Sequence, residues 1–330
     1  MPLGKNIGRH PAGRVTKLMP GKIVQGILLV LLFFFYGDRH PGAVPKEASP
    51  EDVQAKGWVV FDSNRAGQFD IYKMRPDGTG VTRLTSSPRW DIYPAWSPDC
   101  RKIVFARHEV GVTRGQGDIF TIAADGREET LVVREGTFPQ FTADGKGILF
   151  ERDRRKVMLF DLVEKKERLL IPPPGNSFDH QIVKPRISPD GKTIIFTTDR
   201  GGGWNLRSMS IRGDQRKVAR GCEGIWDYDG GRIFYIAGGQ WTGTAIRTAA
   251  WPAGKPEKYL DLTGSYRHVY FPSVSDDGRH ILFSACPAGQ HDHFSANYQI
   301  FIKPAEGGPA VRITRNEFTD RWPSLNTKAR

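Results

Sequence analysis

Short apolar runs separated by tight turns dominate most of the chain. In residues 91–126, an apolar segment at 94–96 is followed by the turn SPDC at 97–100 and by strand-like runs at 103–105 and 118–122. Apolar runs of this length, bounded by Pro, Asp and Gly, are typical of β-strands joined in tight hairpins. The pattern therefore predicts an all-β fold built from many short strands.

The turn at 97–100 differs from the other turns at its last residue. Ser-Pro-Asp-X has the chemistry of a type I turn, in which the fourth residue must tolerate a positive φ. Gly fills this place in the later turns, whereas Cys100 fills it here. We therefore expect Cys100 to adopt a left-handed backbone, at a cost of about 1 kcal/mol.

The same unit recurs along the chain. Later copies open at Pro139, Pro185, Trp226 and Pro272, and the last turn residues of the five copies stand at 100, 145, 191, 230 and 278. A period of about 40–50 residues with four short strands in each repeat is typical of the blades of a β-propeller. The repeat therefore predicts a propeller.

The two ends of the repeat region each carry part of a copy. Residues 58–85 have the later strands of a unit without its first, and residues 320–325 have the first strand without the rest. We expect the C-terminal strand to pair with the first blade and close the ring, because closure satisfies edge strands that would otherwise stay unpaired. Five full copies and this composite predict a six-bladed propeller over residues 57–325, followed by a tail at 326–330.

An apolar run at residues 23–36 follows a basic region at 1–22 and precedes a linker at 37–56. Fourteen residues are few for a bilayer span but suit the core of a secretory signal peptide. No Ala-x-Ala cleavage site follows Tyr36, so a cleaved signal peptide and an uncleaved membrane anchor both stay open. Either segment predicts a periplasmic or other extracytoplasmic location, with the propeller secreted or tethered.

The charge of the chain argues against nucleic acid as a partner. The formal net charge is +12, and residues 1–46 contain seven Lys and Arg against one Asp, which leaves +6 on the remainder. This excess is modest for so large a surface, and no nucleic-acid-binding motif accompanies it. We expect a monomer that binds a protein, saccharide or peptide.

The three cysteines are Cys100, Cys222 and Cys286. A small and odd number argues against a disulfide framework. Cys222 and Cys286 fall in loops expected on one face, so a single bridge between them stays open.

Several repeats place a charged or imidazole side chain where an inner strand is expected to begin: Asp91, His180, Asp227, His268 and Asp320. Such residues often cap a turn or form hydrogen bonds between blades. The alternative is a polar channel mouth that receives a ligand or a partner peptide. The candidates for ligand binding are Asp91, Asp227, His268, Asp320 and Arg321.

The most compact cluster of potential metal ligands is Gln290-His291-Asp292-His293. His-x-His on an extended segment can offer two nitrogens to Zn, Mn or Fe. The candidate metal ligands are His180, His268, His291 and His293, although spacing alone is a weak signal and an exposed polar loop stays the alternative. No nucleophile elbow, P-loop or dinucleotide fingerprint appears, so no catalytic residue is assigned.

Several segments resemble the TolB-type propeller repeat, among them WSPD at 96–99, SPDGKTIIF at 188–196 and SDDGRHILF at 275–283. The resemblance covers about residues 57–325. It implies a six-bladed propeller that binds partner proteins of the cell envelope. The N-terminal α/β domain of TolB has no counterpart here, where only a linker of about 20 residues precedes the repeats.

The repeat also resembles that of oligogalacturonate lyases, whose propeller holds a metal with several His and a Gln. That resemblance implies a metal-dependent carbohydrate-active enzyme as the alternative function, with loop histidines as ligands of Zn, Mn or Fe. The first resemblance favours a non-catalytic, exported or membrane-tethered binding scaffold of the cell envelope that needs no cofactor. It would recognise a protein or small ligand at the channel mouth.

Overall fold

The computed structural model describes residues 54–112, 117–173, 179–239, 242–262, 265–290 and 292–328. These residues form strands β1 to β23 and no helix, which confirms the all-β prediction. None of them forms a helix with the length and hydropathy of a membrane span. The chain divides into two compact units, Met1–Lys46 and Glu47–Arg330. The basic region, the apolar run at 23–36 and most of the linker lie outside the described residues.

The first sheet joins the two ends of the described chain. It contains, in spatial order, β23 (Asp320–Asn326), β1 (Trp58–Ser63), β2 (Asp70–Met74) and β3 (Thr82–Arg83). β23 runs antiparallel to β1, with Trp58 opposite Asn326 and Ser63 opposite Asp320. The pairing expected between the C-terminal segment and the strand that begins at Trp58 is therefore present.

A seven-stranded sheet follows in the chain. Its strands are β4 (Trp90–Trp96), β5 (Lys102–His108), β6 (Gly117–Ala123), β7 (Thr130–Phe141), β8 (Gly147–Arg152), β9 (Lys156–Asp161) and β10 (Lys166–Ile171). The long strand β7 belongs to two repeats, because its residues up to Gly136 pair with β6 and those from Thr137 onward pair with β8.

Three four-stranded antiparallel sheets complete the described part, each with its strands in chain order. The first contains β11 (Val183–Ile187), β12 (Thr193–Thr198), β13 (Asn205–Ser210) and β14 (Gln215–Arg220). The second contains β15 (Cys222–Trp226), β16 (Arg232–Gly239), β17 (Gly243–Ala250) and β18 (Glu257–Leu260). The third contains β19 (Tyr266–Val274), β20 (His280–Pro287), β21 (Gln299–Pro304) and β22 (Val311–Arg312).

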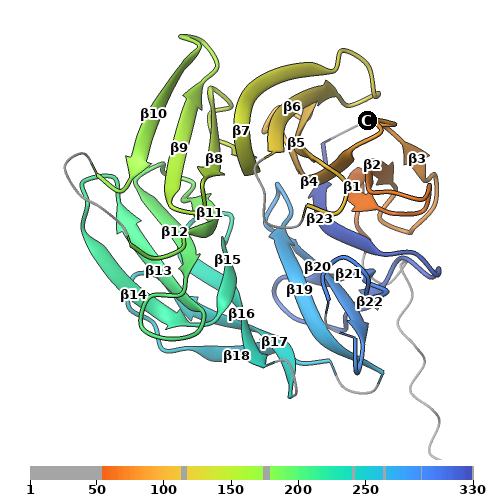
Figure 1. Ribbon diagram of the computed structural model, residues 1–330. Coiled ribbons are helices and arrows are strands. Elements are labelled where there is room, and N and C mark those ends of the chain that lie inside the picture. Colours follow the sequence, from red (N-terminus) through yellow and green to blue (C-terminus); the bar gives the residue numbers. More distant parts are fainter. Residues whose placement is uncertain are drawn as a thin grey trace, which may run out of the picture. The chain divides into compact units, whose positions relative to one another are not determined.

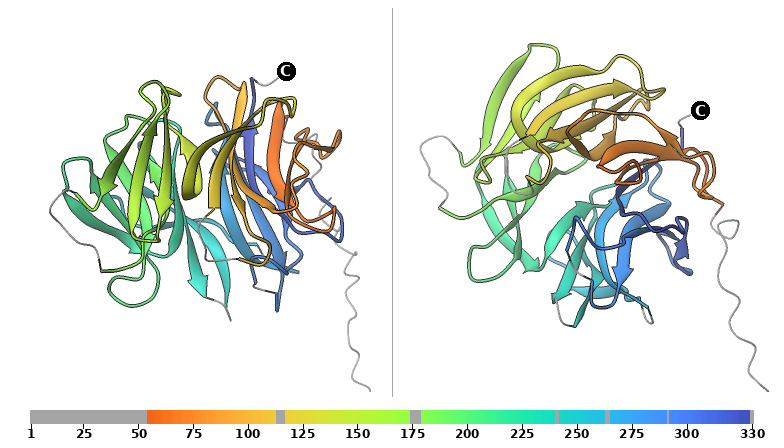
Figure 2. Two further views of the ribbon diagram at one scale, coloured as in Figure 1. Left: turned by 45° about the horizontal axis from the view of Figure 1, so that its top comes forward. Right: turned by 45° about the vertical axis from the view of Figure 1, so that its right-hand side comes forward.

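The inner strands of successive repeats contact one another. β23 contacts β4, β4 contacts β7, β7 contacts β11, β11 contacts β15, β15 contacts β19, and β19 contacts β23. The ribbon views show the sheets following each other around a common centre in the order of their colours (Figures 1 and 2). This is a propeller-like arrangement.

Apolar side chains fill the spaces between successive sheets. Six clusters of buried hydrophobic residues are present among the described residues, and each draws on neighbouring repeats. In one of them, Val59 and Met74 of the first sheet pack with Leu282 and Ile302 of the last. Full burial of one such side chain contributes about 1.5–3 kcal/mol, so these clusters are the main stabilising contacts between sheets.

The turn that opens each repeat has the predicted conformation. Cys100 has a φ of +65°, which confirms its left-handed backbone, and Gly191 has a φ of +71° at the equivalent place. The Ser97 hydroxyl donates to the Asp99 carboxylate at 2.6 Å and accepts the Lys102 N–H at 2.9 Å. These bonds close the turn before β5 begins.

Candidate functional site

Each inner strand has a residue with a left-handed backbone at the same place, and β7 has a second, Glu135, in the part that pairs with β6. The residues at the shared place, with φ between +50° and +61°, are Tyr93, Phe138, Lys184, Glu223, Phe271 and Trp322. The register of each inner strand with its neighbour shifts at this place. A β-bulge bends its strand and redirects a side chain. The six bulges lie at equivalent positions of their strands.

Four of the six bulge residues are aromatic and contact one another. Tyr93 stacks on Phe138 with 4.2 Å between ring centroids, and Trp322 meets Tyr93 edge-on at 4.9 Å. Phe271 lies 4.7 Å from Trp322. We call Tyr93, Phe138, Phe271 and Trp322 the aromatic plug, because their rings meet where the inner strands converge. Each pair contributes about 0.5–1.5 kcal/mol beyond its buried area.

The other two bulge residues form an ion pair beside the plug. The Lys184 ammonium contacts the Glu223 carboxylate, and their side chains are 15% and 1% exposed. The same ammonium lies 5.2 Å from the centroid of the Trp322 ring. The second oxygen of Glu223 accepts the Phe271 N–H at 2.6 Å. The pair therefore joins a neighbouring bulge to the plug.

Side chains of the second strands accept the N–H groups of the following bulges. Asp62 accepts the Tyr93 N–H at 3.1 Å, and Glu151 accepts the Lys184 N–H at 3.3 Å. Burial raises the pKa of Asp62 to about 6, although the Arg321 guanidinium opposes this. These bonds compensate for the ladder hydrogen bonds that the bulges interrupt.

A cavity of about 930 Å³ adjoins the aromatic plug. All four plug residues line it. The exposed residues Trp204, Arg220 and Asp292 also line it, so the cavity reaches the protein surface. Lys184 and Trp322 also line a second, much smaller pocket, so they form part of the partition between the two. A volume near the upper end of the range for ligand sites can hold a molecule of several rings or a short peptide.

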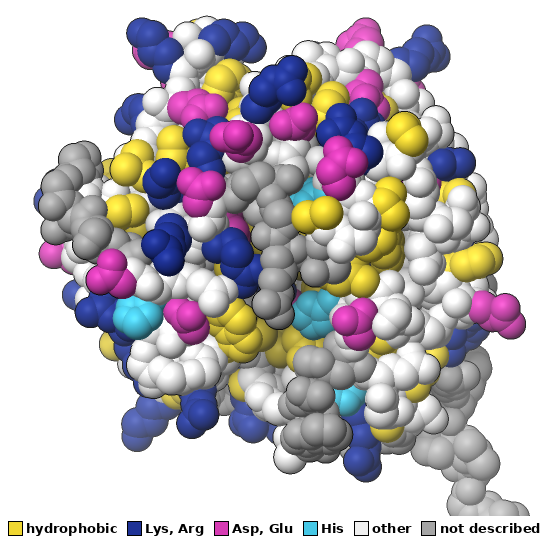
Figure 3. Space-filling view, in the orientation of Figure 1, with side chains coloured by type: hydrophobic (Ala, Val, Ile, Leu, Met, Phe, Trp, Pro, Cys, Tyr) yellow, Lys and Arg dark blue, Asp and Glu magenta, His cyan; other side chains and the backbone are white. Residues whose placement is uncertain are grey.

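Hydrophobic and histidine side chains lie near the centre of the face shown in the space-filling view (Figure 3). Lys and Arg side chains lie mostly farther out on the same face. An apolar centre with polar groups around it is the usual composition of a binding site.

Two titratable groups in the cavity wall are held in their neutral forms by burial. Burial raises the pKa of Glu151 to about 8, although the charges of Arg154 and Lys184 lower it. Burial also lowers the pKa of His108 to about 4, and the Nε2 of this residue lies 3.0 Å from the Thr137 hydroxyl. At neutral pH the wall therefore presents a protonated carboxyl group and an uncharged imidazole.

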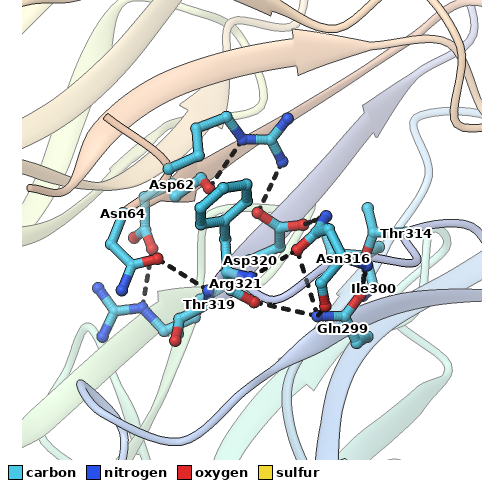
Figure 4. A network of polar contacts seen from close by, with 12 residues as sticks. Asp62, Asn64, Gln299, Ile300, Thr314, Asn316, Thr319, Asp320 and Arg321 are labelled. Atoms are coloured by element: carbon cyan, nitrogen blue, oxygen red, sulfur yellow. Dashed lines mark hydrogen bonds and ion pairs between the residues drawn. The ribbon is translucent and has the colours of Figure 1, made fainter. Parts of the chain in front are cut away.

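Arg321 lines the cavity although its side chain is 0% exposed to solvent. Its Nε donates to Asp62 at 2.8 Å, and its guanidinium lies 3.9 Å from the centroid of the Phe69 ring. Figure 4 shows this ion pair beside the bonds of Asp320 and Asn316. Among the described residues, the Nη2 of Arg321 has no hydrogen-bond partner.

Two predicted binding residues have structural partners. Asp91 is buried and accepts two hydrogen bonds from Arg107, at 2.7 and 2.9 Å. Asp320 is buried and accepts hydrogen bonds from Arg65 and Asn316, both at 2.8 Å. Neither carboxylate is among the residues that line the cavity. Both carboxylates thus form hydrogen bonds within the fold, which favours the structural interpretation of these positions over that of a polar channel mouth.

Asp227 lies at a different place from the one predicted. It was expected at the start of an inner strand. In the structure it follows the inner strand β15 and lies in the next turn, where it accepts a hydrogen bond from the Arg232 guanidinium at 2.9 Å. This placement was wrong because the turn after Trp226 is degenerate, so the sequence pattern did not identify β15. His268 is buried in β19, and the exposed His180 lies 3.6 Å from Asp199. None of these three lines the cavity.

Of the predicted metal ligands, only His293 lines the cavity, and its ring lies 4.4 Å from that of Tyr270. His291 lies outside the described residues. No group of three or more His, Cys, Asp or Glu that could hold a metal occurs within the described ranges. The metal site stays a prediction. Cys222 and Cys286 are free thiols, and burial raises their pKa values to about 12 and about 11.

Sequence reasoning missed the bulge residues. Five of the six stand directly before a proline, namely Tyr93, Phe138, Lys184, Phe271 and Trp322, and Glu223 stands before Gly224. Four repeats were taken to open at that proline, so Tyr93, Phe138, Lys184 and Phe271 were left out. The recurring aromatic-Pro dipeptide was a signal that could have found them.

Comparison with known proteins identifies related sequences and folds. The family model described as TolB beta propeller domain matches residues 49–227. TolB from Acinetobacter baumannii superposes with a TM-score of 0.64 at 18% identity, over 82% of this chain and 67% of that chain. The putative TolB from Agrobacterium tumefaciens superposes with a TM-score of 0.60 at 16% identity, over 83% and 94% of the two chains. Such identities show a common fold alone.

A curated relative matches a shorter segment. An uncharacterized protein of Agrobacterium fabrum is 40% identical over 55 residues, which are 17% of this chain and 19% of that protein. The chain thus matches about a fifth of that relative's length.

Proposed function

Because the chain belongs to the TolB beta propeller domain family, we propose that it is a non-catalytic binding scaffold of the cell envelope. A partner peptide or small ligand binds in the cavity beside the aromatic plug. The cavity of about 930 Å³ carries this proposal, because four aromatic side chains and several charged groups converge in its wall. Large apolar sites with a few fixed polar groups are typical of ligand binding.

We further propose that the scaffold is a closed, six-bladed ring. Three observations support this count: the cyclic contacts of the six inner strands, the six hydrophobic clusters and the pairing of β23 with β1. Closure would leave no inner edge of a sheet unpaired. It would also hold the cavity wall in one geometry before the ligand arrives, which lowers the ordering cost of binding.

Export or tethering of the propeller rests on the N-terminal sequence. The basic region and the apolar run at 23–36 are typical of a signal peptide or signal anchor. Alkaline phosphatase fused after residue 56 of the chain tests this location, because the enzyme is active only outside the cytoplasm. Inactive fusions would contradict an extracytoplasmic propeller.

A cavity-filling variant tests the binding function directly. Ala237 lines the cavity, and Ala253 is an exposed residue in the turn after β17. Ala237→Trp should abolish capture of the native ligand or partner by the full chain, whereas Ala253→Trp should leave it unchanged. The measurement is cross-linking in cells followed by mass spectrometry, with thermal unfolding as the control for folding. Equal capture by both variants would show that the cavity takes no part in binding.

The metal-dependent carbohydrate-active enzyme has less support as an alternative. Of the three candidate ligands that the structure describes, His293 alone lines the cavity. Metal analysis of the purified chain and of a His291→Ala/His293→Ala variant tests this alternative. A stoichiometric metal that the variant loses would favour the enzyme over the scaffold.

A further inference from the structure

The positive charge of the propeller is concentrated in one sheet. Residues 183–220, which span β11 to β14, contain nine Lys and Arg against three Asp, a net charge of +6. This equals the whole excess of residues 47–330, so the remaining residues of that unit sum to zero. A field of this kind attracts anions toward one side of the molecule.

The exposed cations of β14 lack acidic partners. Within the described part of the chain, Arg216, Lys217 and Arg220 take part in no ion pair, whereas Arg107 and Arg152 of the seven-stranded sheet are both paired. Burial and the nearby charge of Arg200 lower the pKa of Arg207 in β13. The charge of this sheet is therefore not neutralised locally.

This basic sheet borders the cavity. Arg220 at the end of β14 lines the cavity wall, as does Trp204, whose side chain is 43% exposed. The cations that line the cavity are Arg154, Lys184, Arg220 and Arg321, against the acids Glu151 and Asp292. Lys184 and Arg321 are paired with Glu223 and Asp62. Since Glu151 is neutral at pH 7, Arg154 and Arg220 stand against Asp292 alone among the described lining residues, and the wall is positive on balance.

Two buried donors in the wall are also unpaired. The Nη2 of Arg321 and the Nε1 of Trp322 have no hydrogen-bond partner among the described residues, and their side chains are 0% and 7% exposed. Buried donors are almost always satisfied in folded proteins, and an unsatisfied one costs free energy. Neither nitrogen has accessible surface, however, so the exposed guanidinium of Arg220 is the charged donor in the wall that an anion can reach.

We propose that the cavity binds an aromatic carboxylate, with its carboxylate on the guanidinium of Arg220 and its ring against the aromatic plug. Arg220 and the basic sheet draw the anion to the cavity mouth. A cationic ligand is disfavoured, because Lys184 already lies against the plug and pairs with Glu223. This inference rests on the proposed binding function and names the chemical class of the ligand.

Calorimetric titration of the full chain with four small probes tests the ligand class. Naphthoate carries ring and charge, naphthamide the same ring with a neutral polar group, acetate the charge alone, and naphthylmethylammonium the ring with the opposite charge. Naphthoate should bind about tenfold more tightly than naphthamide or more, since a charge-assisted hydrogen bond is about twice as strong as a neutral one. Acetate and the ammonium probe should not bind measurably. Binding of naphthamide or the ammonium probe as tight as that of naphthoate would overturn the proposal.

Two variants test the role of Arg220 in binding. Arg220→Gln should weaken naphthoate binding and reduce its dependence on salt. Arg212→Gln is the matched control, because Arg212 belongs to the same basic sheet but does not line the cavity.

The outcomes separate the ligand class from the binding function. Absence of naphthoate binding, or equal affinities in Arg220→Gln and the Arg212→Gln control, would refute the aromatic carboxylate. Arg220 is exposed, so its replacement by Gln should leave folding intact. Capture of a cellular partner that Ala237→Trp abolishes would still support the binding scaffold in that case.

Discussion

Replacement of Glu151 by Gln should stabilise the protein at and above neutral pH. Glu151 is 1% exposed, and burial raises the pKa of its carboxyl group to about 8 from an ordinary value of 4.5. Its Oε2 accepts the Lys184 N–H at 3.3 Å, and a glutamine carbonyl can keep this bond. The substitution therefore removes the ionisation without removing the contact.

The sign of the effect follows from proton binding. A raised carboxyl pKa means that the folded state holds its proton more tightly than the unfolded state does. The contribution is fully present below about pH 4.5 and is lost as the pH rises to about 8. At about 1.4 kcal/mol per pH unit, the wild type loses about 5 kcal/mol across this window and about 3 kcal/mol by pH 7. Glu151→Gln should not show this loss.

Denaturant unfolding of the full chain between pH 5 and pH 9 measures the effect. The quantity of interest is the difference in unfolding free energy between variant and wild type, because Asp62 and Asp70, whose pKa values burial also raises, titrate in both proteins. Glu164→Gln, an exposed residue in the turn before β10, is the control and should match the wild type. A variant no more stable than wild type at pH 8 would refute the reasoning.

Three further predictions concern the same inner strands. Lys184→Met should destabilise the fold by about 3–5 kcal/mol in the same assay, since it leaves Glu223 buried and unpaired, and Glu223→Leu in the same chain should restore most of the loss. Asp91→Ala should cost about 3 kcal/mol or more by stripping the buried Arg107 of a partner. Asp91→Ala should leave the affinity for the ligand unchanged in calorimetry. A loss of affinity would show that Asp91 belongs to the binding site. Deletion of residues 320–330 should abolish cooperative unfolding measured by circular dichroism, because β1 loses β23.

The repeat in the sequence predicted the strands well because each strand is set by local chemistry. Apolar runs and Ser-Pro-Asp turns act within a few residues of each other, and the left-handed Cys100 followed from the turn type alone. Asp227 was misplaced where that chemistry failed. Its turn lacks the Ser-Pro pair, so β15 could not be recognised from the pattern.

The binding cavity was harder to predict, because it depends on partners distant in the chain. In the sequence, Asp91 and Arg321 both appear as charged residues near the start of an inner strand. Only the fold shows that Asp91 accepts hydrogen bonds from Arg107. Arg321 bonds to Asp62, 259 positions away, and is among the residues that line the cavity. Period and composition carry no information on such pairs.

The bulges connect the stability of the fold to its binding function. Bulky residues rarely adopt a positive φ, yet Tyr93, Phe138, Phe271 and Trp322 all do so at about 1 kcal/mol or more each. Regular inner strands would keep their ladder hydrogen bonds without this cost. Strain of this kind persists where the surrounding structure enforces it, and it concentrates at functional sites. The strained residues here are those that form the plug and line the cavity, so their conformation supports a role in binding beyond packing.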